Sequence, residues 1–297
     1  MTDAATPRWR ARLGELHPRR FFLEAWEAID AEAEAERQAR RAQGLGYDYR
    51  PLVAFCAGAV FLTLMEYIGV PAFLHRIVRA LIELEQSGEL SGTFFQEWRR
   101  GPWWELSQHI YWAAWRVLGF LLMPIAVVKL SGERVRDQYL STEGFAEHLW
   151  IYLGAFAVVL VAVVAVSFTD GFSSYYPFYK SAERSWFDFL FWELWYVLQF
   201  LSLEFFFRGW WLRAGKTLMG SGAIFAMVVP YVMIHFGKEL PETLAATFAG
   251  IFLGTLAMRT QSIWGGFLVH CLVAVAMDVA ALLQTDGLPT RWWPDLG

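Results

Sequence analysis

Long apolar stretches separated by short polar segments run through most of the chain after residue 50. A helix needs about 20 apolar residues to cross a membrane, and seven stretches reach or approach that length. They predict an all-α fold, a polytopic transmembrane bundle of seven or eight helices with its functional core in the last four. The expected spans are 51–73, 109–130, 149–168, 186–211, 220–236, 243–258 and 262–283.

The polar segments suggest how the chain is divided. Residues 31–43 are strong helix formers without an apolar stripe, which predicts a solvated helix. The connection 74–104 mixes charged and aromatic residues and predicts an amphipathic helix on the membrane surface, or alternatively an eighth membrane helix. The expected parts are a polar N-terminal extension (1–50), N-terminal membrane helices (51–185), a catalytic membrane core (186–283) and a C-terminal tail (284–297).

Basic residues predict the orientation of the chain. With the N-terminus inside, sixteen Lys and Arg face the cytoplasm and eight face outward. This asymmetry predicts a cytoplasmic N-terminus, in a bacterial inner (plasma) membrane. A net charge of −4 gives no sign of a nucleic-acid partner. The expected partners are membrane lipid and a membrane-bound protein or peptide.

Ionisable residues inside membrane spans are costly unless they are paired or hydrated, so each is a functional candidate. Eleven residues separate two glutamates of the fourth span, which places them about 20° from one helix face. A Glu and an Arg at i, i+4 in the same span can pair, which alone would also suit a structural salt bridge. Imidazole with carboxylate suits water activation or metal binding. The candidates are Glu193, Glu204, Arg208, His235, His270 and Asp278.

Helical spacing places these candidates at two depths, about 10–15 Å apart. The expected inner group is Glu204, Arg208 and His270. The expected outer group is Glu193, His235 and Asp278. We predict that one tall, water-accessible cavity joins the two groups.

Three short motifs in the last spans resemble those of a known family. They are Glu204-Phe205-Phe206-Phe207-Arg208-Gly209, Tyr231-x-x-x-His235 and His270. In this order they are similar to Glu-Glu-x-x-x-Arg, Phe-x-x-x-His and His-x-x-x-Asn/Asp of the CPBP family (CAAX protease and bacteriocin processing, or Abi) of intramembrane proteases. The resemblance covers residues 186–283. Leu203 stands in place of the first glutamate, Ala274 in place of Asn/Asp, and Tyr231 in place of Phe.

The resemblance implies an intramembrane endopeptidase, or metalloendopeptidase, that cleaves a membrane-associated protein or peptide. In this interpretation Glu204, or alternatively Glu193, is the base that activates water. Arg208 keeps Glu204 ionised, and His270 with Asp278 stabilises the oxyanion or completes a metal site.

The resemblance leaves the metal and the activity open. His235, His270 and Glu204 would hold zinc or another divalent ion, with His235 otherwise orienting the water. A metal-free glutamate mechanism fits the same residues equally well. Because Leu203 and Ala274 are apolar, the alternative is a catalytically inactive binding or protection protein, or a proton-linked carrier.

Overall fold

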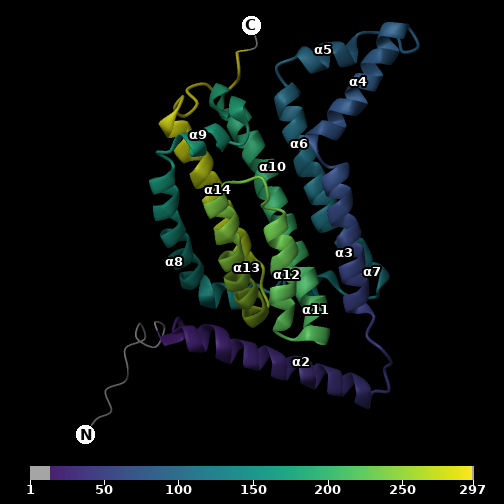
Figure 1. The fold of residues 1–297 in the computed structure, drawn as a ribbon, viewed down its shortest axis with the longest axis vertical. Coiled ribbons are helices and arrows are strands. Elements are labelled where there is room, and N and C mark those ends of the chain that lie inside the picture. Colours follow the sequence, from purple (N-terminus) through teal and green to yellow (C-terminus); the bar gives the residue numbers. More distant parts are fainter. Residues whose placement is uncertain (1–13, 296–297) are drawn as a thin grey trace. The chain divides into compact units, whose positions relative to one another are not determined.

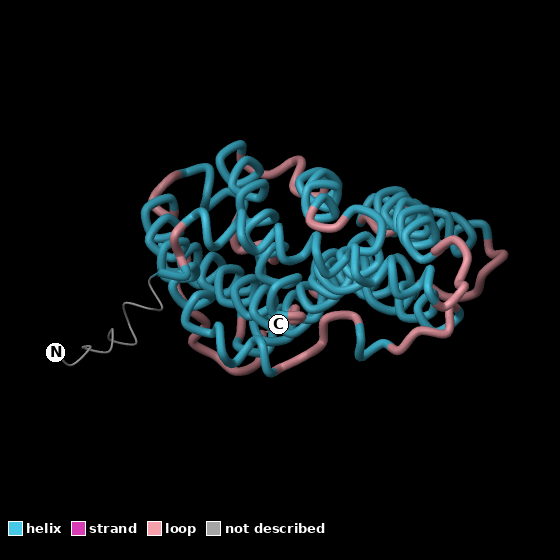
Figure 2. The backbone as a smooth tube through the Cα atoms, turned by 90° about the horizontal axis from the view of Figure 1, so that it is seen from below, coloured by secondary structure: helices cyan, strands magenta, loops and turns pink. Residues whose placement is uncertain are grey.

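The computed structural model describes residues 14–295, which form helices joined by loops (Figures 1 and 2). No strand lies in this part of the chain, only an isolated bridge between Leu140 and Ser262. The predicted all-α class is confirmed. The α-helices are α2 (Ala25–Ala42), α3 (Arg50–Tyr67), α4 (Pro71–Ser87), α5 (Phe94–Arg100), α6 (Trp104–Val117), α7 (Met123–Leu130), α8 (Glu143–Val166), α9 (Asp170–Tyr175), α10 (Trp186–Glu204), α11 (Leu212–Met219), α12 (Gly222–Met233), α13 (Leu240–Thr260) and α14 (Trp264–Gln284). The 3₁₀- and π-helical segments are η1 (Arg19–Glu24), η2 (Leu118–Leu122), η3 (Val135–Asp137), η4 (Lys180–Arg184) and η5 (Phe205–Trp211).

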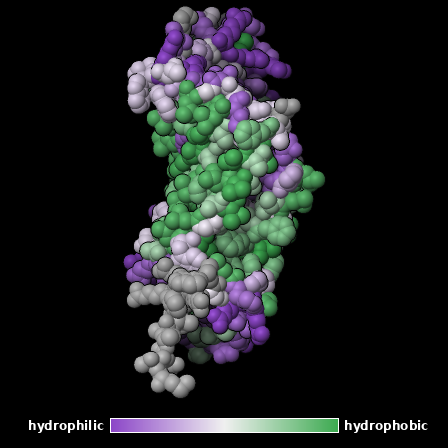
Figure 3. Space-filling view, turned by 90° about the vertical axis from the view of Figure 1, so that its left-hand side faces the viewer, coloured by the Kyte–Doolittle hydropathy of each residue, from purple (hydrophilic) through white to green (hydrophobic). Residues whose placement is uncertain are grey.

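Six helical stretches of the described chain are long and apolar enough to cross a membrane. Apolar side chains accordingly cover much of the face seen in Figure 3. The fifth expected span, 220–236, contains only the 12-residue helix α12, so the predicted count of seven or eight is not confirmed. The six stretches are Arg50–Tyr67, Trp104–Leu130, Glu143–Val166, Trp186–Met219, Leu240–Thr260 and Trp264–Gln284.

The polar connection after the first span forms two helices. Helix α4 buries Leu74 and Val78, one turn apart, which is the amphipathic pattern expected for this connection. Its Glu85 accepts hydrogen bonds from the backbone N–H groups of Phe95 and Gln96, at the start of α5. The carboxylate therefore satisfies two of the N–H groups that a helix start leaves unpaired.

The chain divides into two compact units. Unit 1 contains the described residues up to Phe55, together with Arg136–Gly144 and Phe207–Ile263. Unit 2 contains Cys56–Val135, Phe145–Phe206 and the described residues from Trp264 onward.

In unit 1, helix α2 docks on α11 and α13 through polar contacts. Trp26 donates to Thr255 (Nε1 to Oγ1, 3.0 Å). Lys216 pairs with Glu32 (Nζ to Oε2, 2.6 Å), and Arg37 donates to the carbonyl of Thr217. The predicted helix over residues 31–43 is correct, but a fully solvated surface for it is wrong.

In unit 2, helix α10 starts in a polar network. The Ser185 hydroxyl accepts a hydrogen bond from the backbone N–H of Asp188, as in an N-cap. The carbonyls of Arg291 and Trp292, in the C-terminal tail, accept from the N–H groups of Trp186 and Phe187 (2.8 and 3.0 Å). The tail therefore satisfies donors that the helix itself cannot.

The carboxylate of Asp188 is the centre of this network and is fully buried. It accepts from the hydroxyls of Ser185 (2.6 Å) and Tyr179 (2.9 Å) and forms an ion pair with Arg184 (2.5 Å). This bonding to Asp188 raises the pKa of the Arg184 guanidinium above its ordinary value. The start of α10 thus depends on one buried acid.

We predict that Asp188→Asn lowers the free energy of unfolding by about 3–5 kcal/mol, because it removes the charge from a buried ion pair. The measurement is thermal or denaturant unfolding in detergent micelles. Asp295→Asn is the matched control, because Asp295 pairs with Arg291 at the same i, i+4 spacing but on the surface (3.2 Å). The control should cost less than about 1 kcal/mol. Equal losses in the two variants would contradict the role of Asp188.

Candidate active site

Two candidates from different helices meet in unit 2. Nδ1 of His270 on α14 lies 2.8 Å from Oε1 of Glu204 at the end of α10. At this distance the two atoms are in direct contact, close enough for an ion pair between a carboxylate and an imidazolium. The Glu204 side chain is fully buried, whereas 18% of the His270 side chain is exposed. The imidazole is therefore the more accessible member of this acid–base pair.

Two neighbours hold this pair in place. The ring of Phe200, one turn before Glu204, stacks on the His270 ring (centroids 5.4 Å apart, planes 5° apart). Gly266, one turn before His270, lies against the Glu204 carboxyl so closely that a Cβ there would collide with Oε2. Glycine therefore allows α14 to approach α10 at the level of the carboxyl group.

The same two helices bring a second set of polar groups together. The Glu193 carboxyl on α10 and the Asp278 carboxyl on α14 lie within hydrogen-bonding reach of each other. Trp192 donates to Asp278 (Nε1 to Oδ2, 3.2 Å). Glu193 is 7% exposed and Asp278 is fully buried.

These four residues form two pairs, at different heights along the two helices. Glu193 and Glu204 lie about 16 Å apart along α10, and His270 and Asp278 about 12 Å apart along α14. Because the helices are antiparallel, the two pairs form at separate levels. Asp278 therefore contacts Glu193 and Trp192 rather than completing a site around His270 through a bend, since α14 is one uninterrupted helix.

The other two candidates meet at one aromatic ring in unit 1. The guanidinium of buried Arg208 lies 3.9 Å from the centre of the Tyr231 ring. The His235 ring packs edge-on against the same ring, and its Nδ1 lies 2.7 Å from the Tyr231 carbonyl oxygen. A carbonyl only accepts, so Nδ1 carries a hydrogen and donates it to Tyr231.

The predicted cavity and ion pair both involve residues of two units. Glu204 belongs to unit 2, and Arg208 and His235 belong to unit 1. The Glu204–Arg208 pairing was based on α-helical spacing, but residues 205–211 form the π-helical segment η5, which has a wider turn. The ion pair and the shared cavity stay predictions.

The Glu204–His270 arrangement does not fit two ligands of one zinc ion. Adjacent ligand atoms of a tetrahedral zinc site lie about 3.3 Å apart, given bonds of about 2.0–2.1 Å. The 2.8 Å between Oε1 and Nδ1 is shorter and corresponds to a direct contact. Within either unit, the described His, Cys, Asp and Glu residues form no group of three that could hold a metal ion.

Three of the four residues that form the two levels lie in a segment that matches a known family. Residues 185–276 match the Rce1-like family model of type II CAAX prenyl endopeptidases. The resemblance to the CPBP family is thereby confirmed for this segment. The match contains Glu193, Glu204 and His270 and ends two residues before Asp278. No curated protein and no solved structure matches the chain.

The match and the apolar helices together have two consequences. The chain is an integral membrane protein, because six of its helical stretches can span a membrane. At the level of the family, the activity is that of a CAAX endopeptidase, which supports a protease.

Sequence reasoning missed Phe200, Gly266 and Trp192. Phe200 and Gly266 each lie one turn before a candidate, at i−4, and Trp192 directly precedes Glu193. The i−4 spacing was an available signal, because side chains one turn apart lie on the same helix face. Aromatic residues are too frequent in this chain for that spacing alone to single out Phe200.

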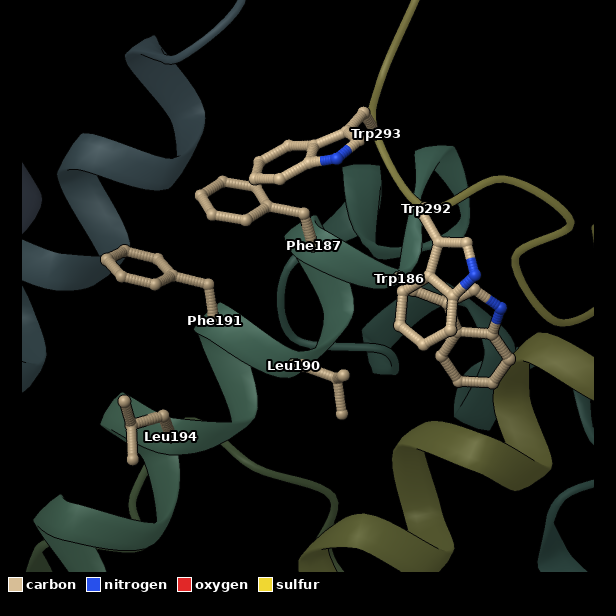
Figure 4. A pocket seen from close by; sticks show the side chains of 7 residues that line it. All are labelled: Trp186, Phe187, Leu190, Phe191, Leu194, Trp292 and Trp293. Atoms are coloured by element: carbon tan, nitrogen blue, oxygen red, sulfur yellow. The ribbon is translucent and has the colours of Figure 1, made fainter.

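An open apolar groove lies elsewhere in unit 2 (Figure 4). It has a volume of about 400 Å³ and lies between the first turns of α10 and the C-terminal tail. None of the six candidates lines it. Its lining residues are Trp186, Phe187, Leu190, Phe191, Leu194, Trp292 and Trp293.

We predict that Gly266→Ala lowers the free energy of unfolding by about 1–3 kcal/mol, because the added methyl group forces the Glu204 carboxyl away from α14. The measurement is unfolding in detergent micelles. Gly154→Ala on α8 is the matched control, since a Cβ there meets nothing within 4 Å. It should be neutral or slightly stabilising.

A double-mutant cycle tests the cause of that loss. In a Glu204→Ala background the carboxyl is gone, so Gly266→Ala should cost less than it does in the wild type. An equal cost in both backgrounds would show that Gly266 does not act through Glu204.

Proposed function

We propose that this protein is an intramembrane endopeptidase that cleaves a membrane-associated protein or peptide, with Glu204 and His270 as the pair that activates water. The observation that carries the proposal is the 2.8 Å contact between Nδ1 of His270 and Oε1 of Glu204. It lies inside the segment that matches the endopeptidase family. Imidazole held by a buried carboxylate is an arrangement that accepts and returns protons during amide hydrolysis.

Exposure divides the roles within the pair. Since Glu204 is fully buried and His270 is partly exposed, His270 is the group that meets water. In this role Nε2 of His270 accepts a proton as water attacks the peptide carbonyl. The imidazolium then returns that proton to the leaving nitrogen as the C–N bond breaks. Glu204 orients the ring and stabilises its transient charge, a role that differs from the direct base expected from the motif.

Arg208 and His235 belong to unit 1, and each carries a group suited to stabilising an oxyanion. A buried guanidinium is able to stabilise negative charge, and so is an imidazolium, whose Nε2 also carries a hydrogen. Tyr231 holds both of them, through its ring and its carbonyl. The substitution of Tyr231 for the Phe of the family motif keeps the ring that supports them.

The proposal includes the orientation of the protein and the membrane in which it lies. The basic residues favour a cytoplasmic N-terminus in a bacterial inner membrane, where lipid surrounds the protein and the substrate is bound to the membrane. The runner-up is a non-catalytic binding or protection protein, which the apolar residues Leu203 and Ala274 favour.

We predict that Glu204→Gln lowers kcat/KM at least about 100-fold, because an amide cannot stabilise the imidazolium. The assay uses purified protein in proteoliposomes and fluorogenic peptides that end in a CAAX sequence, with and without a prenyl group. Glu193→Gln should remain within severalfold of the wild type, since Glu193 lies at the other level. Thermal unfolding of each variant checks that it is folded.

Two outcomes would contradict this assignment. If Glu193→Gln abolishes cleavage and Glu204→Gln does not, the water-activating acid is Glu193. If the wild type cleaves none of these peptides nor any processed membrane peptide, the non-catalytic alternative is supported instead.

We also predict that cleavage persists after divalent metals are removed with a chelator, because the Glu204–His270 contact is too short for two ligands of one ion. Activity would be measured together with elemental analysis of the purified protein. Loss of cleavage that zinc restores would show that Glu204 and His270 separate to bind a metal.

A further inference from the structure

The proposed mechanism does not use the second level of polar groups in unit 2. There Glu193 and Asp278 are 7% and 0% exposed, within a segment long and apolar enough to cross a membrane. Their surroundings are apolar and aromatic, including Trp192, Tyr196 and Ala274. Two carboxyl groups in such a place need a chemical reason.

The reason is a proton bound by one of the two carboxyl groups. Among residues 14–295, no N–H or O–H group is placed to donate to either oxygen of Glu193 or to Oδ1 of Asp278. The two carboxyls nevertheless lie within hydrogen-bonding reach of each other. Ionised carboxylates only accept hydrogen bonds, so one of the two must be protonated for the contact to exist.

The donors around the pair decide which acid carries the proton. Asp278 accepts from the Trp192 indole at Oδ2 and lies near the backbone N–H of Phe178, and both favour a negative charge on it. Glu193 has no such donor among the described residues. We propose that Glu193 and Asp278 form a proton-binding site within the membrane span, in which protonated Glu193 donates to the carboxylate of Asp278.

Few other titratable groups face this site. Lys180 acts on Asp278 through its charge from η4, and Cys271 on α14 lies in the field of Glu193. His109 on α6 packs on the Trp192 ring at 5.1 Å, and Tyr179 packs on it at 6.5 Å. Only Lys180 is a permanent cation at neutral pH, and its amine favours the same carboxylate that Trp192 favours.

The bound proton makes folding depend on pH. An exposed glutamic acid in the unfolded chain releases its proton near pH 4.3. Above that pH, the folded chain therefore holds one proton more than the unfolded chain. Stability then falls as the pH rises, by a factor of about ten in the folded-to-unfolded ratio per pH unit, until the pair itself ionises.

The test compares the wild type with Glu193→Gln. The amide of this variant donates a hydrogen bond at every pH without having to take up a proton. Unfolding in detergent micelles is followed from pH 5 to pH 9. The wild type should lose stability relative to Glu193→Gln by about tenfold per pH unit over part of this range. Glu66→Gln, at an exposed glutamate near the end of α3, is the matched control and should follow the wild type.

Infrared spectroscopy gives a direct readout of the proton. The carbonyl stretch of a protonated carboxylic acid should be present at neutral pH in the wild type and in Glu66→Gln, and reduced in Glu193→Gln. A difference spectrum without this band would overturn the proposal, as would parallel stability curves for the wild type and Glu193→Gln.

Asp278→Asn tests the direction of the hydrogen bond. Asp278 is assigned the role of hydrogen-bond acceptor for Glu193 and Trp192. Losing its carboxylate in Asp278→Asn should therefore destabilise the protein more than Glu193→Gln does. The reverse order would overturn the assignment of the proton to Glu193. None of these measurements depends on cleavage, so the proton site can fail or succeed independently of the protease.

Discussion

The close approach of α14 to α10 at Gly266 is the contact on which the polar interior of unit 2 depends. A Cβ at this position would occupy the place of the Glu204 carboxyl. Its absence lets the carboxyl lie against α14 and meet His270 one turn further along. Both helices continue without a break to the second pair, where Glu193 faces Asp278.

A hydrocarbon environment explains why these groups come in pairs. Burying one charge among apolar side chains costs several kcal/mol, whereas two groups that share a proton or a charge offset part of that cost. In unit 2, a carboxyl group contacts an imidazole at one level, and two carboxyl groups lie together at the other. In unit 1, Arg208 lies against the face of the Tyr231 ring, which offers a buried cation a partner without a second charge.

Hydropathy was sufficient for the fold class and most spans, because crossing a membrane requires length and apolarity alone. The expected span 220–236 is not confirmed, because α12 ends at Met233 and the following residues form turns. Hydropathy failed for the surface of α2. That helix docks through side chains such as Trp26 and Glu32, whose hydropathy does not distinguish a docked polar face from a solvated one.

The sequence predicted only those features of the candidate site that depend on a single helix. The 100° rotation per residue correctly placed Glu193 and Glu204 on one face, and both now face α14. The partners were less predictable, because the register between two helices depends on where they approach most closely. Gly266 sets that point, and nothing in the periodicity of either helix marks it.

The two departures from the family motif now have a structural context. Leu203 and Ala274 stand where the family has an acid and an amide or acid, and both are buried apolar side chains (5% and 6% exposed). Ala274 packs with Trp192 and Tyr196, between the two polar levels of unit 2. A polar side chain at either place would need its own partner in apolar surroundings. The proposed catalytic chemistry therefore depends on Glu204 and His270. The apolar side chains around Ala274 separate that pair from the proton shared by Glu193 and Asp278.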